Sequence, residues 1–197
     1  YTNRIEGEHT RPSDIERALQ QDFSTNADLA RKQRLAVAHI QTEAHCETEL
    51  DARRATQGDE VARWLYSADA LSWLHRELFS GLPADDLRLS DGSEMVPGAL
   101  RQRGVAVGRH EAPAWEALPD FLQRWQTVYA GTRRGEAAVV ALAASHHRLA
   151  WMHPFLDGNG RVARLHTHLL LHSSGLTNGL WSPLRGFART ESRYKSL

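Results

Sequence analysis

Twelve consecutive residues in the second half of the chain bring together the side chains that phosphate chemistry requires. They begin at His153 and read His-Pro-Phe-Leu-Asp-Gly-Asn-Gly-Arg-Val-Ala-Arg, residues 153–164. Gly158 and Gly160 flank Asn159, and glycines allow a backbone to approach a ligand closely. Successive N–H groups in such a turn, at the start of a helix, form an anion-binding concavity. The turn therefore predicts a site for phosphate groups.

The charged side chains around this turn have separate predicted roles. Asp157 directly precedes the turn, where a carboxylate can hold the Mg²⁺ that bridges phosphate oxygens. Arg161 and Arg164 are three residues apart on one helix face, and guanidinium groups bind phosphates in a bidentate manner. His153 titrates near neutrality and can take a proton from an attacking hydroxyl group. A plain glycine turn between helices is the alternative, but it leaves the histidine, the acid and the two arginines without a purpose.

Helical periodicity dominates the elements that must position this turn. A helix starts at residues 11–14, and the further helical stretches are residues 26–54 (one long helix or two abutting ones), 61–79, 114–129, 136–152, 159–172 and a last turn or helix at 190–197. The only strand signal is a short alternation, Val105-Ala106-Val107, bounded by Gly104 and Gly108. We therefore expect an all-α domain with a small β-hairpin flap over the active site. We expect residues 1–60 to form an N-terminal helical region that packs as one compact unit with a core, residues 61–197, that carries the predicted site.

The composition excludes several functional classes. Lys plus Arg number 24 and Asp plus Glu number 24, so no global field favours nucleic acid or an acidic membrane. No apolar run is long enough to span a membrane. The single cysteine, Cys46, allows no internal disulfide, which fits a reducing compartment. We expect a cytoplasmic protein that binds its partners at a local site.

The sequence resembles the Fic family. Residues 153–164 match the family motif His-x-Phe-x-Asp/Glu-Gly-Asn-Gly-Arg-x-x-Arg at every specified position. Upstream, residues 98–108 look like the family's flap hairpin and residues 144–152 like the helix that leads into the motif. Downstream, Arg193-Tyr194-Lys195 is similar to the family's segment whose tyrosine lies near the adenine. The likeness covers roughly residues 65–197.

This resemblance implies a protein adenylyltransferase, which moves AMP from ATP to a Ser, Thr or Tyr hydroxyl group of a target protein, the chain itself included. His153 would be the base, Asp157 would hold Mg²⁺ and Arg164 would meet the γ-phosphate. The other implied nucleotide-binding residues are Gly158, Asn159, Gly160, Arg161 and Tyr194. The implied target-docking flap is Val105, Ala106, Val107 and Gly108.

The N-terminal segment Thr2-Asn3-Arg4-Ile5-Glu6-Gly7 has two interpretations. On its own, Thr2 is a helix cap, Gly7 a helix stop and Glu6 a solvent-exposed acid. The pattern is also similar to the inhibitory motif of the Fic subclass with an N-terminal inhibitory helix. In that subclass the glutamate pairs with the second arginine of the motif, here Arg164, and blocks productive γ-phosphate binding. Given the motif match, we favour autoinhibition by Glu6.

Several alternatives stay open. The same site fits removal of AMP from a protein, with Glu6 positioning water, or transfer from another donor such as UTP, GTP or a phosphocholine carrier. A non-catalytic module is disfavoured by the intact His153 and Asp157. The expected partners are ATP and a target protein, with no membrane and no nucleic acid bound by these 197 residues; a homodimer is left open. His168 and His172 have a spacing that suits zinc, but without a third ligand we favour helix-surface or C-terminal-turn histidines.

Overall fold

The computed structural model describes residues 2–131, 135–177 and 180–195, and this part of the chain is mainly helical. The helices of its first half are α1 (Thr2–Ile5), α2 (Pro12–Leu19), α3 (Ala27–Gln57), α4 (Glu60–Leu65), α5 (Ala68–Phe79) and a short 3-10 turn, η1 (Ala84–Leu87). The second half holds η2 (Trp115–Ala117), α6 (Leu118–Tyr129), α7 (Glu136–Met152), α8 (Asn159–Ser173), α9 (Pro183–Arg189) and α10 (Glu191–Lys195). Between the halves, β1 (Ala106–Val107) and β2 (His110–Glu111) form a hairpin. The all-α fold with a small hairpin is confirmed.

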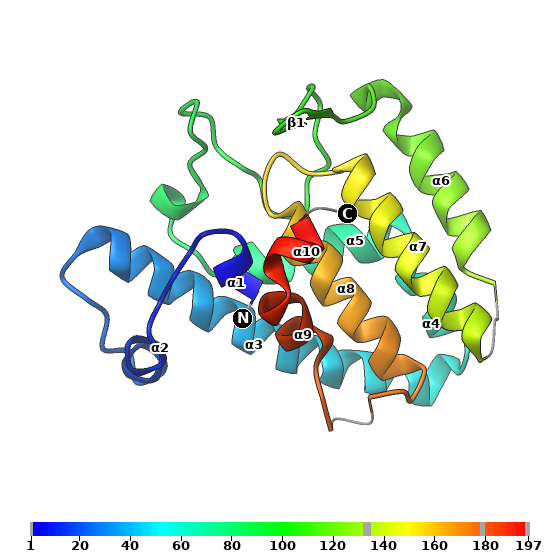
Figure 1. Cartoon of the computed structure of the whole chain (residues 1–197), viewed down its shortest axis with the longest axis horizontal. Coiled ribbons are helices and arrows are strands. Elements are labelled where there is room, and N and C mark those ends of the chain that lie inside the picture. Colours follow the sequence, from blue (N-terminus) through cyan, green and yellow to red (C-terminus); the bar gives the residue numbers. More distant parts are fainter. Residues whose placement is uncertain (1, 132–134, 178–179, 196–197) are drawn as a thin grey trace.

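Helix α8 lies at the centre of the fold (Figure 1), packed against α3, α5, α7 and α9. Every residue from 161 to 171 on this helix is buried, whichever face it occupies. A helix covered on all sides is fixed in position, and so are the polar side chains at its N-terminal end.

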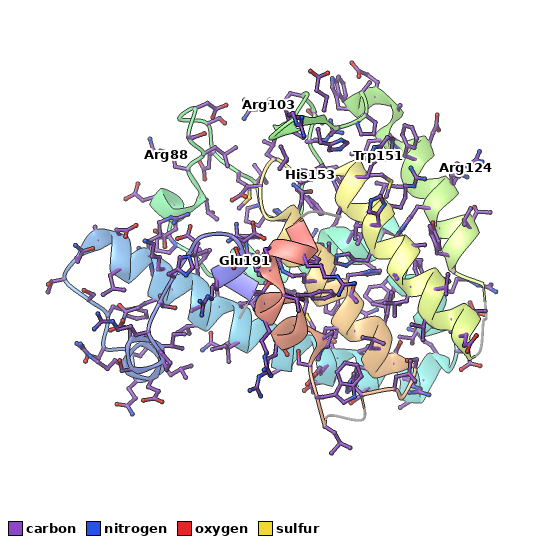
Figure 2. The ribbon with its side chains drawn as sticks, in the orientation of Figure 1. Arg88, Arg103, Arg124, Trp151, His153 and Glu191 are labelled. Carbon is purple, nitrogen blue, oxygen red and sulfur yellow. The ribbon has the colours of Figure 1, made fainter. Side chains whose placement is uncertain are left out.

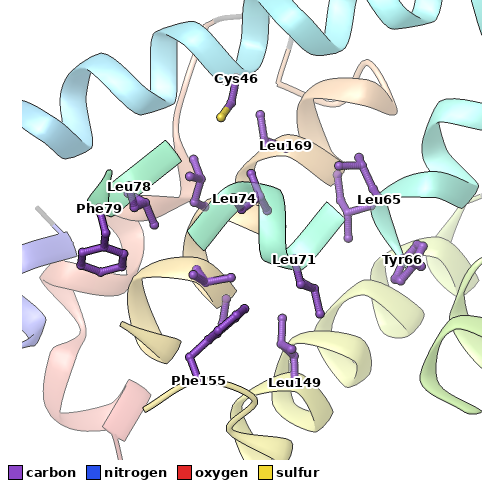
Figure 3. Packing of buried hydrophobic residues seen from close by; sticks show 14 of the residues in the cluster. Cys46, Leu65, Tyr66, Leu71, Leu74, Leu78, Phe79, Leu149, Phe155 and Leu169 are labelled. Carbon is purple, nitrogen blue, oxygen red and sulfur yellow. The ribbon is translucent and has the colours of Figure 1, made fainter. Parts of the chain in front are cut away.

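The hydrophobic core lies where α3, α5, α7 and α8 meet. Figure 3 shows Leu71 and Leu74 of α5 among Leu149, Phe155 and Leu169, and all five side chains are at most 1% exposed. Full burial of one such side chain stabilises the fold by about 1.5–3 kcal/mol. Phe155 belongs to the 153–164 motif, so the core anchors the active-site loop directly.

Local capping explains where the observed helices differ from the sequence predictions. The stretch 26–54 is one helix, which begins after Asn26, whose side chain accepts a hydrogen bond from Leu29 N at 3.0 Å. The prediction of a continuous helix over 61–79 was wrong, because Ser67 caps a new helix by accepting from Ala70 N at 3.0 Å. Helix α9 was not predicted; Ser182 caps it and Pro183 occupies its first turn. The predicted C-terminal helix is present as α10, and its last two residues lie outside the described part of the chain.

The hairpin is short and antiparallel, with Ala106 opposite Glu111 and Val107 opposite His110. Its turn depends on Gly108, whose φ of 60° lies in the left-handed region that favours glycine. Among the described residues, no helix combines the length and the apolar character that a membrane span needs.

Candidate active site

The loop between α7 and α8 carries the candidate active site, on the side of the molecule that bears the hairpin; Figure 2 labels His153 there. Helix α7 ends at Met152, and the next residue, His153, adopts a left-handed conformation with φ 49°. The side chain of Asn159 then closes the loop. Its Oδ1 accepts from Phe155 N and its Nδ2 donates to Phe155 O, each at 2.8 Å. The resemblance implied a phosphate-cradling role for Asn159, but the amide is engaged in the loop, so only the backbone N–H is available to a ligand.

The hydrogen bonds of His153 determine which of its nitrogens can act as a base. Nδ1 lies 3.0 Å from the carbonyl oxygen of Ala150. Because a carbonyl oxygen only accepts, Nδ1 carries the proton and Nε2 of the neutral ring is left with a lone pair. Burial lowers the pKa of His153, and the bond to Ala150 opposes this shift only in part. The ring is therefore a neutral base at physiological pH, with Nε2 as the proton acceptor.

The glycine turn is closely packed and presents backbone donors at the start of α8. Gly158 has φ +77°, and a Cβ there would lie 2.5 Å from the ring of Phe79. Helix α8 starts at the next residue, so the N–H groups of its first turn have no acceptor within the helix. Those free donors and the helix dipole favour an anion at this position.

Asp157 and Arg161 form an ion pair at the mouth of the turn. Arg161 Nη2 donates to Asp157 Oδ2 at 3.0 Å, and the Asp157 side chain is 49% exposed. The Arg161 guanidinium is buried over the ring of Phe79 at 4.7 Å. An exposed carboxylate beside an anion turn is the donor set that Mg²⁺ shares with phosphate oxygens.

Arg164 is buried and forms hydrogen bonds and an ion pair with the N-terminal segment. Its Nε donates to the hydroxyl oxygen of Thr2 at 2.6 Å, and its Nη2 donates to the Thr2 carbonyl at 3.3 Å. The same Nη2 pairs with Glu6 Oε1. Glu6 reaches so far into the turn that a Cβ added to Gly160 would collide with its carboxylate. Thr2, which on its own suggested a helix cap, instead lies within α1 and holds Arg164.

Tyr194 lies on the other side of Arg164, whose guanidinium is 5.9 Å from the ring centre. The Tyr194 hydroxyl donates to His146 Nε2 at 2.9 Å, since His146 Nδ1 carries the proton that it gives to Thr167 Oγ1 at 2.7 Å. Thr167 in turn donates to the carbonyl of Ala163. Burial, and then the charge of Arg164, lower the pKa of His146 to about 4, so the imidazole in this series of hydrogen bonds is neutral. Contact of Tyr194 with an adenine remains a prediction.

Two positioning residues, His75 and Arg101, connect the loop to the rest of the protein. His75 Nδ1 accepts from Gly98 N at 2.7 Å, so its Nε2 carries the proton and donates to Asp157 O at 3.2 Å. Its ring also stacks on Phe155 at 4.1 Å. No sequence signal marked this histidine, because its partners are far along the chain.

Arg101 anchors the segment that leads into the hairpin. Its Nε donates to the His153 carbonyl at 2.7 Å and its Nη2 to the Pro113 carbonyl at 2.6 Å. Its own N–H donates to Pro154 O at 2.9 Å. The buried guanidinium thus links the catalytic loop to both ends of the hairpin segment. Its position in the family-like stretch 98–108 was noted from the sequence, but its role was not.

The hairpin of β1 and β2 lies at the surface, beside the end of α7. His110 donates through Nε2 to the carbonyl of Trp151 at 2.9 Å, which ties β2 to the end of α7. Ala106, Val107 and Gly108 are exposed and Val105 is half-buried. A short exposed strand of this kind can pair with an extended peptide.

The sequence of this chain is similar to a known protein family and to named proteins. Residues 65–171, more than half of the chain, match the model of the Fic/DOC family. Proteins named protein adenylyltransferase Fic, from Drosophila ananassae and Drosophila persimilis, are each 35% identical to it over 79 residues. The matched stretch covers 40% of this chain and only 16% of each relative.

Solved structures share the fold at low sequence identity. A Fic family protein from Desulfovibrio desulfuricans matches 98% of this chain with a TM-score of 0.69 and 18% identity, over 52% of its own length. Fic-1 from C. elegans matches the whole chain with a TM-score of 0.64 and 20% identity, also over 52% of its length. A Fic-domain signalling protein from Bacteroides thetaiotaomicron matches 88% with a TM-score of 0.64 and 19% identity, over 60% of its length.

Proposed function

The chain belongs to the Fic/DOC family, and from that premise we propose that it is a protein adenylyltransferase that moves AMP from ATP to a hydroxyl group of a target protein. The observation that carries the proposal is the neutral His153, with Nε2 unprotonated, beside the anion turn that opens α8. A base and an anion-binding turn held on one rigid loop meet the two needs of nucleotidyl transfer. The name of the Drosophila relatives agrees with this activity.

The proposed reaction assigns one task to each group. The hydroxyl oxygen attacks the α-phosphorus, the bond to the bridging oxygen of the β-phosphate breaks, and pyrophosphate leaves. His153 Nε2 takes the hydroxyl proton. The backbone donors of the turn and Arg161 hold the phosphates, and this electrostatic stabilisation is the main contribution of a protein to such transfers. Arg164 would receive the γ-phosphate once it is free.

Asp157 is the residue that would hold a Mg²⁺ ion. Its carboxylate is half-exposed at the mouth of the turn and lies where phosphate oxygens would complete an all-oxygen ligand set. When bound, the ion would neutralise charge on the phosphates.

We further propose that Glu6 keeps the enzyme inactive. Its carboxylate occupies the Nη2 of Arg164 and fills the space above Gly160. A γ-phosphate brought to Arg164 would meet a like charge there, so the nucleotide would settle with its α-phosphorus out of line for attack. The Glu6 side chain is 34% exposed, whereas Arg164 is 2% exposed. The glutamate is therefore the partner that can leave.

The exposed hairpin supports a docking role for the target. An extended segment of the target would add to β1 by main-chain hydrogen bonds, which places its hydroxyl residue over His153. Because such bonds use the backbone, they leave the choice between Ser, Thr and Tyr to the side-chain surroundings.

Mass spectrometry of the Glu6→Gly protein tests the proposal. The variant is incubated with Mg²⁺, a cell lysate and an equimolar mixture of ATP, GTP and UTP, and modified peptides are then sequenced. We expect AMP on Ser, Thr or Tyr residues, and none with Glu6→Gly/His153→Ala. UMP or GMP in place of AMP would refute the choice of donor. Release of AMP from a pre-labelled target by the wild type, without any transfer by Glu6→Gly, would point instead to hydrolytic removal of AMP.

A further inference from the structure

A second group of titratable side chains lies between α3 and α8, away from the glycine turn. Along α3, His39, Glu43 and Glu47 follow one another at four-residue intervals, and along α8, His168 and His172 do the same. Because residues four apart share a helix face and the two helices pack together, the two rows face each other. No third ligand for His168 and His172 was visible in the sequence; the structure supplies carboxylates from α3, with Glu47 121 residues away from His168.

Three of these side chains converge on one point. His168 Nε2 lies 2.6 Å from Glu47 Oε1 and 3.6 Å from Glu43 Oε1. Glu43, Glu47 and His168 each offer one ligand atom, and these atoms all lie within 4.8 Å of one another. His168 is 3% exposed, so the prediction of a helix-surface histidine was wrong for this residue.

Two imidazoles beside this cluster have buried ring nitrogens without a hydrogen-bond partner among the described residues. His39 is 6% exposed, both of its ring nitrogens are of this kind, and its Nε2 is 3.9 Å from Glu43 Oε2. His172 Nδ1 is the third such nitrogen and lies 3.9 Å from Glu47 Oε1. Its other nitrogen, Nε2, is fixed by Asp51 at 2.9 Å. Leaving a buried polar atom unsatisfied costs about 1–3 kcal/mol, and a ligand bound by His172 Nδ1 would remove that cost at this atom.

We propose that Glu43, Glu47 and His168 bind a divalent transition-metal ion, with Zn²⁺ the best match and His172 Nδ1 as the fourth ligand. Mixed imidazole and carboxylate ligands suit Zn²⁺, whereas Mg²⁺ and Ca²⁺ prefer oxygen alone. Metal-to-ligand bonds of about 2.0–2.2 Å place tetrahedral ligand atoms about 3.3–3.6 Å apart. The observed separations of 2.6, 3.6 and 3.9 Å need only small side-chain shifts to reach that spacing.

The surrounding contacts fit the outer shell of a metal site. Asp51 holds the far nitrogen of His172, as carboxylates commonly do for metal-bound imidazoles. His39 approaches the second oxygen of Glu43. His168 follows Arg164 by one turn of α8, so the ion would fix α3 against the helix that presents the phosphate-binding arginines. This inference does not depend on the proposed transferase activity.

Metal titration of the tag-free, EDTA-stripped chain tests the site. Zn²⁺ is the probe. Its binding is measured by calorimetry, and the Zn²⁺ retained after dialysis is measured by metal analysis. The test variant is Glu47→Gln/His168→Gln. Its matched control is His45→Gln/Glu77→Gln, which removes a more exposed His–Glu pair between α3 and α5. We expect the wild type and the control to keep one Zn²⁺ per chain, and the test variant to bind it at least about tenfold more weakly.

Spectroscopy of Co²⁺ in the wild-type chain keeps the test decisive if the test variant does not fold. Strong visible d–d bands at one equivalent of Co²⁺, abolished by Zn²⁺ and retained in His153→Ala/Asp157→Asn, would support a tetrahedral site at this position. Weak bands typical of hydrated Co²⁺ would overturn the proposal. Equal Zn²⁺ affinity of the wild type and a folded test variant would overturn it as well.

Discussion

Removing the Glu6 carboxylate should strengthen ATP binding while leaving AMP binding nearly unchanged. In the proposed mechanism Glu6 and a γ-phosphate compete for the same guanidinium of Arg164, and AMP has no γ-phosphate. Glu6→Gly therefore frees a buried cation for ATP alone. The prediction separates competition at Arg164 from a general loosening of the N-terminal segment, which would affect both nucleotides.

The size of the effect follows from the exposure of the two partners. A hydrogen bond to a charged group contributes about 1.5–3 kcal/mol. Arg164 is 2% exposed but Glu6 is 34% exposed, so water screens part of the pair and the lower end, about 1.5–2 kcal/mol, applies. Since 1.4 kcal/mol corresponds to a factor of ten, ATP should bind about ten- to thirtyfold more tightly to Glu6→Gly.

Calorimetric titration with ATP and with AMP, each in the presence of Mg²⁺, measures both affinities. Glu8→Gly is the matched control, because Glu8 belongs to the same segment but pairs with Arg31 at 2.6 Å. It removes the same charge without touching Arg164. Equal gains for ATP and AMP, or equal gains in Glu6→Gly and Glu8→Gly, would refute competition at Arg164.

Three further predictions follow from the buried groups. The acid limb of the pH–rate profile of Glu6→Gly should lie below the ordinary imidazole pKa of about 6.5. Burial lowers the pKa of His153, and activity is lost only as the pH falls through that lowered value. An acid limb above about 6.5 would contradict this. Gly158→Ala should lower the urea midpoint and the labelling rate far more than Gly81→Ala, since a Cβ would meet Phe79 at position 158 and open space at position 81; equal effects would contradict the strain argument. The free energy of unfolding should fall as the pH drops from about 6.5 to 4, because each neutral buried histidine is protonated in the unfolded chain but not in the native chain. The expected loss is on the order of 1.4 kcal/mol per pH unit for each such histidine. These histidines have pKa values lowered by burial to about 3 or 4: His39, His75, His146 and His166. Urea unfolding followed by tryptophan fluorescence measures this, and stability independent of pH across the window would be the contrary result.

Local sequence signals predicted most of the fold. Helices 136–152 and 159–172 were found almost to the residue, because glycines and the motif mark their ends. The break between α4 and α5 was missed, since Leu65 and Leu71 keep a helical spacing across Ser67 and only the capping bond reveals the interruption. Helix α9 was missed because its glycine and proline suggested a loop, while Ser182 and Pro183 in fact start it.

Side-chain roles that depend on distant partners could not be predicted. The residues of 153–164 lie together in sequence, so their chemistry was visible. His75 acts through Gly98 and Asp157, and nothing near it in sequence indicates either partner. His168 was taken for a surface residue because Glu43 and Glu47 approach it only through the packing of α3 on α8. Asn159 was predicted to belong to the phosphate-binding turn, but nothing in the sequence indicates that its side chain closes the loop through Phe155.

Transfer of radiolabel from α-labelled ATP to protein is the most direct test of the central claim. Four chains are compared side by side with Mg²⁺ and lysate: the wild type, Glu6→Gly, Glu8→Gly and Glu6→Gly/His153→Ala. We predict strong labelling by Glu6→Gly, little by the wild type and Glu8→Gly, and none by the double variant. Equal labelling by the wild type and Glu6→Gly, or labelling that survives loss of His153, would contradict the account.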